Sequence, residues 1–222
     1  MKMKTDIFLN IHADIYARFT HIRTQLVQGS KESQASALGE VLSEISCEII
    51  EQVFMVLLKA PQHAHHHSES EKVVQQILEA IRKYLPWSVS FLGNERLLPL
   101  VEYLSGTIQI EDQSIYMTYP ISKQLAEQVQ NASLKLGEGD VHEIPKALKL
   151  LTEVIDVGVT HLMREPKKSL KFNFVVDKTL NGVINMTTHL GYKRLEKLGS
   201  QLDHKAAINY IDYFLQFMRH QA

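Results

Sequence analysis

The sequence contains a single cysteine, Cys47, among its 222 residues. One cysteine cannot form an intramolecular disulfide, and such a chain is typical of a compartment in which thiols stay reduced. The carboxylates of Glu44 and Glu48 nearby would raise the pKa of the thiol, so a cysteine nucleophile is not expected. We therefore expect a cytoplasmic protein in which Cys47 packs as a small apolar residue.

Long apolar runs are also lacking. The longest aliphatic run, 53–58, is far shorter than the roughly 20 residues that a membrane-spanning helix needs. The start, residues 1–4, resembles the basic head of a signal peptide, but Asp6, Asn10 and Asp14 interrupt what would have to be its apolar core. We expect neither a cleavable signal nor a membrane span.

Neither sign of charge is in excess, because 24 lysines and arginines face 25 aspartates and glutamates. Such a chain has no bulk attraction for phosphate backbones or anionic lipids, so neither nucleic acid nor membrane is expected as a partner. Local basic clusters are interpreted as solvated helix surface. They are Lys167, Lys168 and Lys171, and Lys193, Arg194 and Lys197.

Sequence motifs that identify an activity are missing. There is no Gly-rich phosphate loop, nucleophile elbow, His-Glu-x-x-His or Cys-x-x-Cys, and Gly137-Glu138-Gly139 is interpreted as a turn. A hydrophobic fraction of 45% with 22% charged residues is ordinary for a globular protein. The sequence therefore predicts a folded protein without naming its chemistry.

Helical periodicity is the feature that the sequence does have. Apolar residues recur three or four positions apart in most of the chain, which is typical of amphipathic helices. Proline, glycine and capping residues mark the expected ends. The expected helices are 7–26, 38–59, 70–85, 94–105, 121–136, 145–165, 169–189 and 203–220.

One short region has a different period. Ile108 and Ile110 alternate with polar residues, and Met117 and Tyr119 do so again after a turn. This predicts one small β-hairpin near residues 107–119. The fold class is therefore all-α, or mainly α: a bundle of seven to eight helices in a single domain, with a possible subdomain break near 137–140.

A histidine cluster lies in the segment 62–70, which has no apolar periodicity and is expected to be a mobile surface loop. Its imidazoles are His63, His65, His66 and His67. Neutral imidazoles bind zinc, nickel or copper, but a defined metal site needs fixed geometry and supporting hydrogen bonds. A metal-binding protein is therefore an alternative and not the favoured hypothesis.

Four glutamates, Glu40, Glu44, Glu48 and Glu51, share one face of the second expected helix. Like charges at this spacing repel by a few tenths of a kcal/mol per pair, so we expect arginine or lysine from a neighbouring helix, or water, to offset them. A carboxylate-bridged metal pair is disfavoured, because no Glu-x-x-His pair occurs in the chain.

Histidines on the expected helices leave an enzyme open as a second alternative. His12, His21, His161 and His189 could meet carboxylates only in three dimensions. A helical histidine beside an apolar stripe is more often a structural residue than a base or a ligand.

The last expected helix is apolar around most of its circumference. One seam is aliphatic, and beside it runs an aromatic seam of Tyr210, Tyr213, Phe214 and Phe217. Such a helix is either central or covered by a partner, which predicts a homodimer or a ligand pocket lined by these rings. The favoured hypothesis is a non-enzymatic helical protein that binds a protein partner, including a second copy, or an apolar small molecule.

Overall fold

The computed structural model describes residues 4–59, 64–170 and 172–221. It is 74% helical and adds a small antiparallel sheet of four strands, which confirms the mainly α class. The helices are α1 (Ala13–Val27), α2 (Ala35–Lys59), α3 (Ala64–Val89), α4 (Asn94–Ser105), α5 (Lys123–Gly137), α6 (Ile144–Val159), α7 (Glu165–Ser169), α8 (Phe174–Leu198) and α9 (His204–Leu215). The strands are β1 (Lys4–Ile11), β2 (Ile108–Glu111), β3 (Ser114–Ile121) and β4 (Met218–Gln221).

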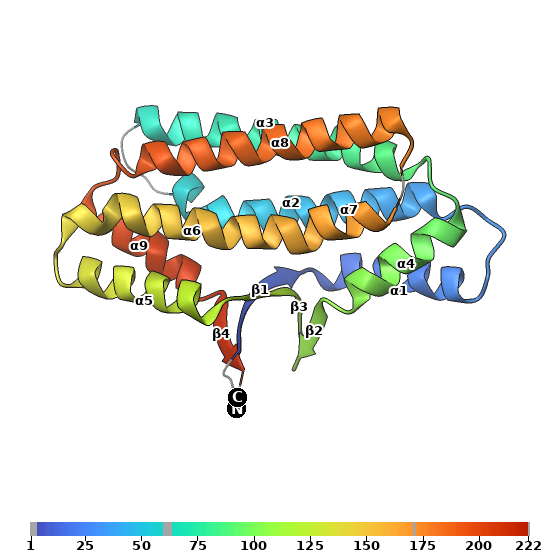
Figure 1. Cartoon of the computed structure of the whole chain (residues 1–222), viewed down its shortest axis with the longest axis horizontal. Coiled ribbons are helices and arrows are strands. Elements are labelled where there is room, and N and C mark those ends of the chain that lie inside the picture. Colours follow the sequence, from blue (N-terminus) through green and yellow to red (C-terminus); the bar gives the residue numbers. More distant parts are fainter. Residues whose placement is uncertain (1–3, 60–63, 171, 222) are drawn as a thin grey trace.

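The helices form layers (Figure 1). The long helices α3 and α8 lie side by side in one layer, and α3 also packs against α2. Below them lie α2 and the continuous run of α6 and α7, and the sheet follows with α1 and α4 on one side and α5 and α9 on the other. Counted with its short extension α7, the α6 helix brings the described part of the chain to eight helices, as predicted.

The sheet has the strand order β2-β3-β1-β4. The predicted hairpin is confirmed as β2 and β3, where Ile110 pairs with Ile115. The next strand, β1, pairs with β3 on one side and with β4 on the other. The sheet therefore joins a strand from each end of the chain to the central hairpin, with β3 and β1 in its middle.

The expectation that the first helix begins at Ile7 was wrong. Residues Lys4–Ile11 form β1, and α1 begins only at Ala13. Ile7 and Ile11 fit a helical step of four, but Ile7, Leu9 and Ile11 also fit the alternation of a strand. The strand is favoured because its side chains are buried between the helices and because two strands supply hydrogen-bond partners.

The last helix is also shorter than expected. It ends at Leu215 instead of reaching His220, and Met218–Gln221 form β4. Asp203 caps its start, since the carboxylate accepts a hydrogen bond from the backbone N–H of Ala206 at 2.8 Å. Pairing with β1 overrides the helical spacing of the final residues.

The expected loop at 62–70 was wrong from Ala64 onward, because α3 already begins there. Adding residues to an existing helix costs little free energy, because nucleation of the first turn is the unfavourable step. The anchor comes from α8, where the Arg194 guanidinium donates to the hydroxyl of Ser70 and to the carboxylate of Glu69, both at 2.8 Å. Arg194 is thus buried, and the interpretation of its cluster as solvated surface was wrong at this residue.

Two prolines lie inside helices that they were expected to end. The α3 helix runs through Pro86 to Val89, and the α6 helix continues past Pro166 to Ser169. The second continuation passes through a π-helical turn, Thr160–Arg164, which lies directly before the first turn of α7. A proline is tolerated in a first turn because its missing N–H is not needed there.

None of the helices in the described residues combines the length and the apolarity that a membrane crossing requires.

Candidate functional site: an apolar pocket between the helices

A pocket of about 160 Å³ lies between the helix layers. Its walls come from α2 and α3, from α8 and from the run of α6 and α7, and β1 and β3 close it on the sheet side. Most side chains that line it are aliphatic. The lining residues of α2 and α3 are Leu42, Ile45, Ser46, Ile49, Ile50, Val53, Phe54, Ile77, Ile81, Leu85, Ser88 and Val89.

The pocket is elongated. Along α8 its lining extends from Leu180 to Leu195. At 1.5 Å per residue, that stretch of helix is roughly 22 Å long. The lining residues therefore outline a channel that follows α8.

Two glycines, one in α6 and one in α8, allow side chains that line the pocket to pack directly against these helices. At Gly158 of α6, a Cβ atom would lie 2.7 Å from the ring of Tyr119, so only glycine lets this ring rest against the helix. At Gly191 of α8, a Cβ atom would lie at ordinary contact distance, 3.6 Å from Phe54 and 3.8 Å from Ile77.

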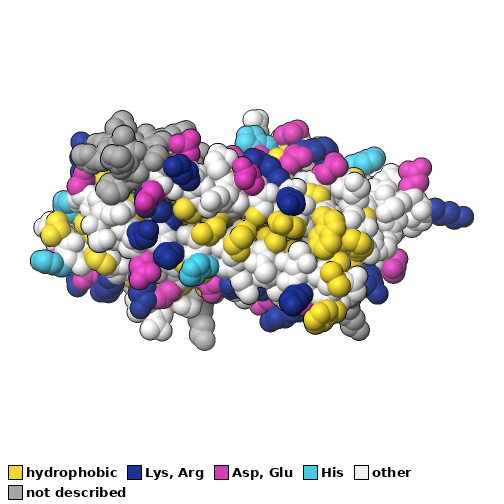
Figure 2. Space-filling view, turned by 90° about the horizontal axis from the view of Figure 1, so that it is seen from above, with side chains coloured by type: hydrophobic (Ala, Val, Ile, Leu, Met, Phe, Trp, Pro, Cys, Tyr) yellow, Lys and Arg dark blue, Asp and Glu magenta, His cyan; other side chains and the backbone are white. Residues whose placement is uncertain are grey.

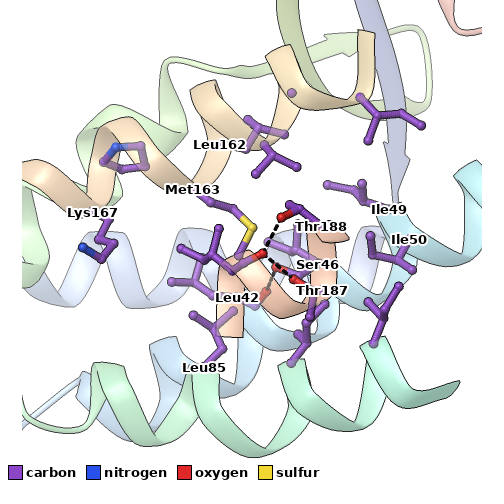
Figure 3. A pocket seen from close by; sticks show the side chains of 18 of the residues that line it. Leu42, Ser46, Ile49, Ile50, Leu85, Leu162, Met163, Lys167, Thr187 and Thr188 are labelled. Atoms are coloured by element: carbon purple, nitrogen blue, oxygen red, sulfur yellow. Dashed lines mark hydrogen bonds between the residues drawn. The ribbon is translucent and has the colours of Figure 1, made fainter. Parts of the chain in front are cut away.

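Three hydroxyl groups gather in the middle of the lining (Figure 3). Ser46 comes from α2, and Thr187 and Thr188 come from α8. Each donates its proton back to its own helix: Ser46 to the Leu42 carbonyl at 2.8 Å and Thr188 to the Ile184 carbonyl at 2.8 Å. Thr187 does the same at 3.0 Å. These hydroxyls are therefore satisfied without a ligand.

The hydroxyl of Tyr119 differs from these. The ring lines the pocket and is only 4% exposed. Among the residues that the structure describes, none forms a hydrogen bond with its oxygen, which still has accessible surface. Burial raises the pKa of this phenol well above its usual value, so it is a neutral hydrogen-bond donor.

A polar cluster adjoins the end of the pocket at which Tyr119 and Tyr192 lie. The Tyr192 hydroxyl and the Arg164 guanidinium both donate to the Asp156 carboxylate at 2.7 Å. Burial alone would raise the pKa of Asp156, but the two hydrogen bonds outweigh it and hold the pKa below its usual value. The same burial and hydrogen bond raise the pKa of Tyr192. Arg164 and Asp156 thus neutralise one another.

Lys167 lies at the other end of the channel (Figure 3). Its ammonium group forms an ion pair with Asp177 in the first turn of α8. Among the described residues that line the pocket, it is the single lysine or arginine, so no part of the lining carries an unmatched cation.

The aromatic residues singled out in the last helix are not in this pocket. Tyr210 and Phe214 are buried in the chain's own core, at 0% and 1% exposed, where they cannot face a partner. Tyr213 and Phe217 are half-buried and stack edge to face, with 5.2 Å between ring centroids. Self-association through these two rings stays a prediction, which sedimentation of the chain at micromolar concentration tests.

Tyr213 and Phe217 line a second hollow, of about 500 Å³, beside His12 and Glu48. This hollow is larger than the apolar pocket, but it is more open and has many polar side chains. His12 pairs with Glu48, and its side chain is 78% exposed. An open polar depression gives less enclosure to a ligand than the channel does.

The histidine cluster is only partly placed. His63 lies outside the described residues, and His65, His66 and His67 lie on the first turns of α3. In the described part of the chain, no group of three or more histidine, cysteine, aspartate or glutamate side chains could hold a metal ion.

Two of the four glutamates of α2 form ion pairs with arginines of neighbouring helices, as expected. Glu44 pairs with Arg18 of α1, and Glu51 lies 3.5 Å from Arg82 of α3. The histidines do not converge either, since His12 pairs with Glu48 whereas His161 pairs with Glu165.

Comparison with known protein families, with curated proteins and with solved structures gives no significant match to this chain.

Sequence reasoning missed the pocket because its lining residues look like core residues. Helical spacing predicts that Ile49 and Ile184 face inward, but not that a space remains between them. The usable signals were Gly158 and Gly191, two glycines inside long helices, where glycine usually marks a close approach or a functional constraint.

Proposed function

We propose that this protein binds an apolar small molecule with an unbranched chain in the channel between α2, α3, α6 and α8. The observation that carries the proposal is the channel itself: a space of about 160 Å³ with a mainly apolar lining. An engineered apolar cavity of about 150 Å³ stays dry and takes up benzene, so a space of this size favours an apolar guest.

The shape of the channel supports a linear guest. The lining extends along several turns of α8, so a linear guest would contact more of it than a compact ring of the same volume would. An alkyl chain can fill such a space and contact aliphatic side chains along its whole length. The satisfied hydroxyls of Ser46, Thr187 and Thr188 do not require polar groups along that chain.

The surface over α3 and α8 offers a route by which an apolar ligand could enter the channel. Hydrophobic side chains gather along the seam between α3 and α8 and extend over much of its length (Figure 2). Both helices also line the pocket. Separation of these two helices would let an apolar chain enter sideways, with apolar contacts on both sides.

Binding of 1,6-diphenylhexatriene, a linear neutral probe that fluoresces in apolar surroundings, tests the proposal. We expect saturable fluorescence with one probe molecule per chain, and competition by long n-alkanes. Ser46→Phe places a ring in the middle of the channel and should abolish binding. Ser36→Phe, on the exposed start of the same helix, is the matched control and should bind as the wild type does.

Circular dichroism of both variants checks that they remain folded. Absence of probe binding to the wild type, or equal binding by Ser46→Phe and Ser36→Phe, would remove the proposal.

A further inference from the structure

The Tyr119 hydroxyl lines the channel and forms no hydrogen bond with any residue that the structure describes. Buried hydroxyl groups are nearly always hydrogen-bonded, because burial without a partner costs free energy. Gly158 makes room for this ring against α6, and a Cβ there would lie 2.9 Å from the Tyr119 oxygen. The fold thus places an unpartnered donor beside an apolar channel.

We propose that the ligand carries one neutral oxygen, a carbonyl or a hydroxyl group, which accepts a hydrogen bond from Tyr119 and fixes the ligand's position. This inference rests on the proposed function, since it names the chemistry of the molecule in the same channel. A few polar groups that orient an otherwise apolar ligand are the usual design of such sites.

The surroundings of Tyr119 select a neutral group over a carboxylate. The charged groups nearest to this end of the channel are Arg164 and Asp156, which are hydrogen-bonded to each other at 2.7 Å. Lys167 lies nine residues along the helix from Gly158, roughly 13 Å away at 1.5 Å per residue, and is paired with Asp177. A buried carboxylate at Tyr119 would meet no unmatched cation, which makes its desolvation unfavourable.

Tyr192 extends the site for a ligand that carries a hydroxyl group. Its own proton is donated to Asp156 at 2.7 Å, and the Arg164 guanidinium also contacts its oxygen. A phenol oxygen has two lone pairs, so one remains to accept a hydrogen bond from a ligand. Tyr119 and Tyr192 are close enough to interact electrostatically, and both line the pocket. The alkyl chain then extends from these two tyrosines past Thr188 toward Leu180, along α8.

A matched pair of ligands tests this inference: methyl undecyl ketone and n-tridecane have the same number of carbons and differ in one oxygen. Their affinities are measured by displacement of 1,6-diphenylhexatriene from the whole chain. We expect the ketone to bind the wild type roughly three- to tenfold more tightly than the alkane, which is the usual range for one hydrogen bond.

Tyr119→Phe should erase this preference by weakening ketone binding while leaving alkane binding as it was. Tyr103→Phe is the matched control, because Tyr103 lies outside the pocket and donates to the His161 carbonyl at 2.9 Å. That control should keep the full preference for the ketone.

Each outcome has a separate meaning. If the wild type binds neither ketone nor alkane, the proposed function fails. If it binds both equally, or if Tyr119→Phe keeps the preference, the channel still binds apolar chains but Tyr119 is not the anchor. Stronger binding of laurate than of the ketone would overturn the neutral head group.

Discussion

Gly158 and Tyr119 are in direct contact: a Cβ on Gly158 would lie 2.7 Å from Cζ of the Tyr119 ring. Real Cβ atoms essentially never approach that closely, and the ring is held in place by β3 and by the pocket walls. The contact joins the sheet to α6 and sets where the tyrosine hydroxyl lies. It therefore links the packing of the fold to the chemistry of the pocket.

Gly158→Ala should destabilise the protein by about 1–3 kcal/mol, the usual cost of overpacking a filled site. Gly191→Ala is the matched control, since its new methyl group would meet Phe54 at an ordinary 3.6 Å. That control should stabilise the protein by up to about 1 kcal/mol, because alanine favours helix more than glycine does. Urea denaturation measures both, and equal effects of the two substitutions would contradict the close contact.

Glu69→Gln should destabilise the protein although Glu69 is half exposed. Its partner Arg194 has a side chain that is only 2% exposed, so the change removes a carboxylate that offsets the charge of a buried guanidinium. Because Glu69 itself stays hydrated, we expect a loss of about 1–2 kcal/mol, less than for a fully buried pair.

A double-mutant cycle isolates this effect. In an Arg194→Met background the Glu69→Gln change should cost less than about 0.5 kcal/mol. Glu79→Gln, on an exposed position of the same helix, should be equally mild in the wild type. A cost of Glu69→Gln that does not depend on Arg194 would show that the ion pair is not its cause.

Local periodicity predicted the helices well where one face of a segment decides the structure. Residues 38–59 are helical as expected, and the hairpin of β2 and β3 lies where alternation placed it. Periodicity gave the wrong secondary structure where pairing with residues distant in sequence determines it. Ile7 and Met218 are in strands because they pair with each other across the whole chain, and no local pattern records that pairing.

The candidate site was harder to predict than the fold. An unpartnered hydroxyl at Tyr119 depends on what surrounds it, and the sequence shows only a tyrosine at an alternating strand position. The aromatic seam of the last helix was conspicuous for the opposite reason. Its rings at Tyr210 and Phe214 fill the core between α2 and α9 and do not mark a binding surface. The Tyr210 hydroxyl donates to the Val53 carbonyl there.

Asp156 should make stability depend on pH in the acid range. Hydrogen bonds from Tyr192 and Arg164 outweigh burial and depress its pKa in the folded state, so the ionised carboxylate stabilises the fold. That stabilisation is present above the unfolded value, about 3.9, and is lost as the pH falls through the folded value. The free-energy difference between wild type and Asp156→Asn should thus be constant near neutral pH and shrink below about pH 4.

Urea denaturation of both proteins at several pH values measures this difference. The carboxylate is nearly half exposed, so we expect only about 1 kcal/mol at neutral pH. Tyr192→Phe removes one donor and should raise the pKa of Asp156 in an NMR titration. A difference that is flat from neutral to acid pH would argue against the depressed pKa.

Tyr119→Phe and Tyr210→Phe should have opposite effects on the free energy of unfolding without ligand. Both rings are buried, at 4% and 0% exposed, and each substitution removes one hydroxyl. The Tyr210 hydroxyl donates to the Val53 carbonyl at 3.3 Å, so its removal loses a hydrogen bond and should cost about 0.5–1.5 kcal/mol. The Tyr119 hydroxyl has no partner among the described residues, so its removal should be neutral or stabilising by up to about 1 kcal/mol.

With saturating methyl undecyl ketone, we expect Tyr119→Phe to have a lower free energy of unfolding than the wild type. A ligand that binds only the folded state raises stability according to its affinity, so the wild type should gain more than Tyr119→Phe. Tyr210→Phe should gain as much as the wild type, because Tyr210 does not line the pocket. Loss of stability in ligand-free Tyr119→Phe equal to that in Tyr210→Phe would mean that the Tyr119 hydroxyl serves the fold and is not kept free for a ligand.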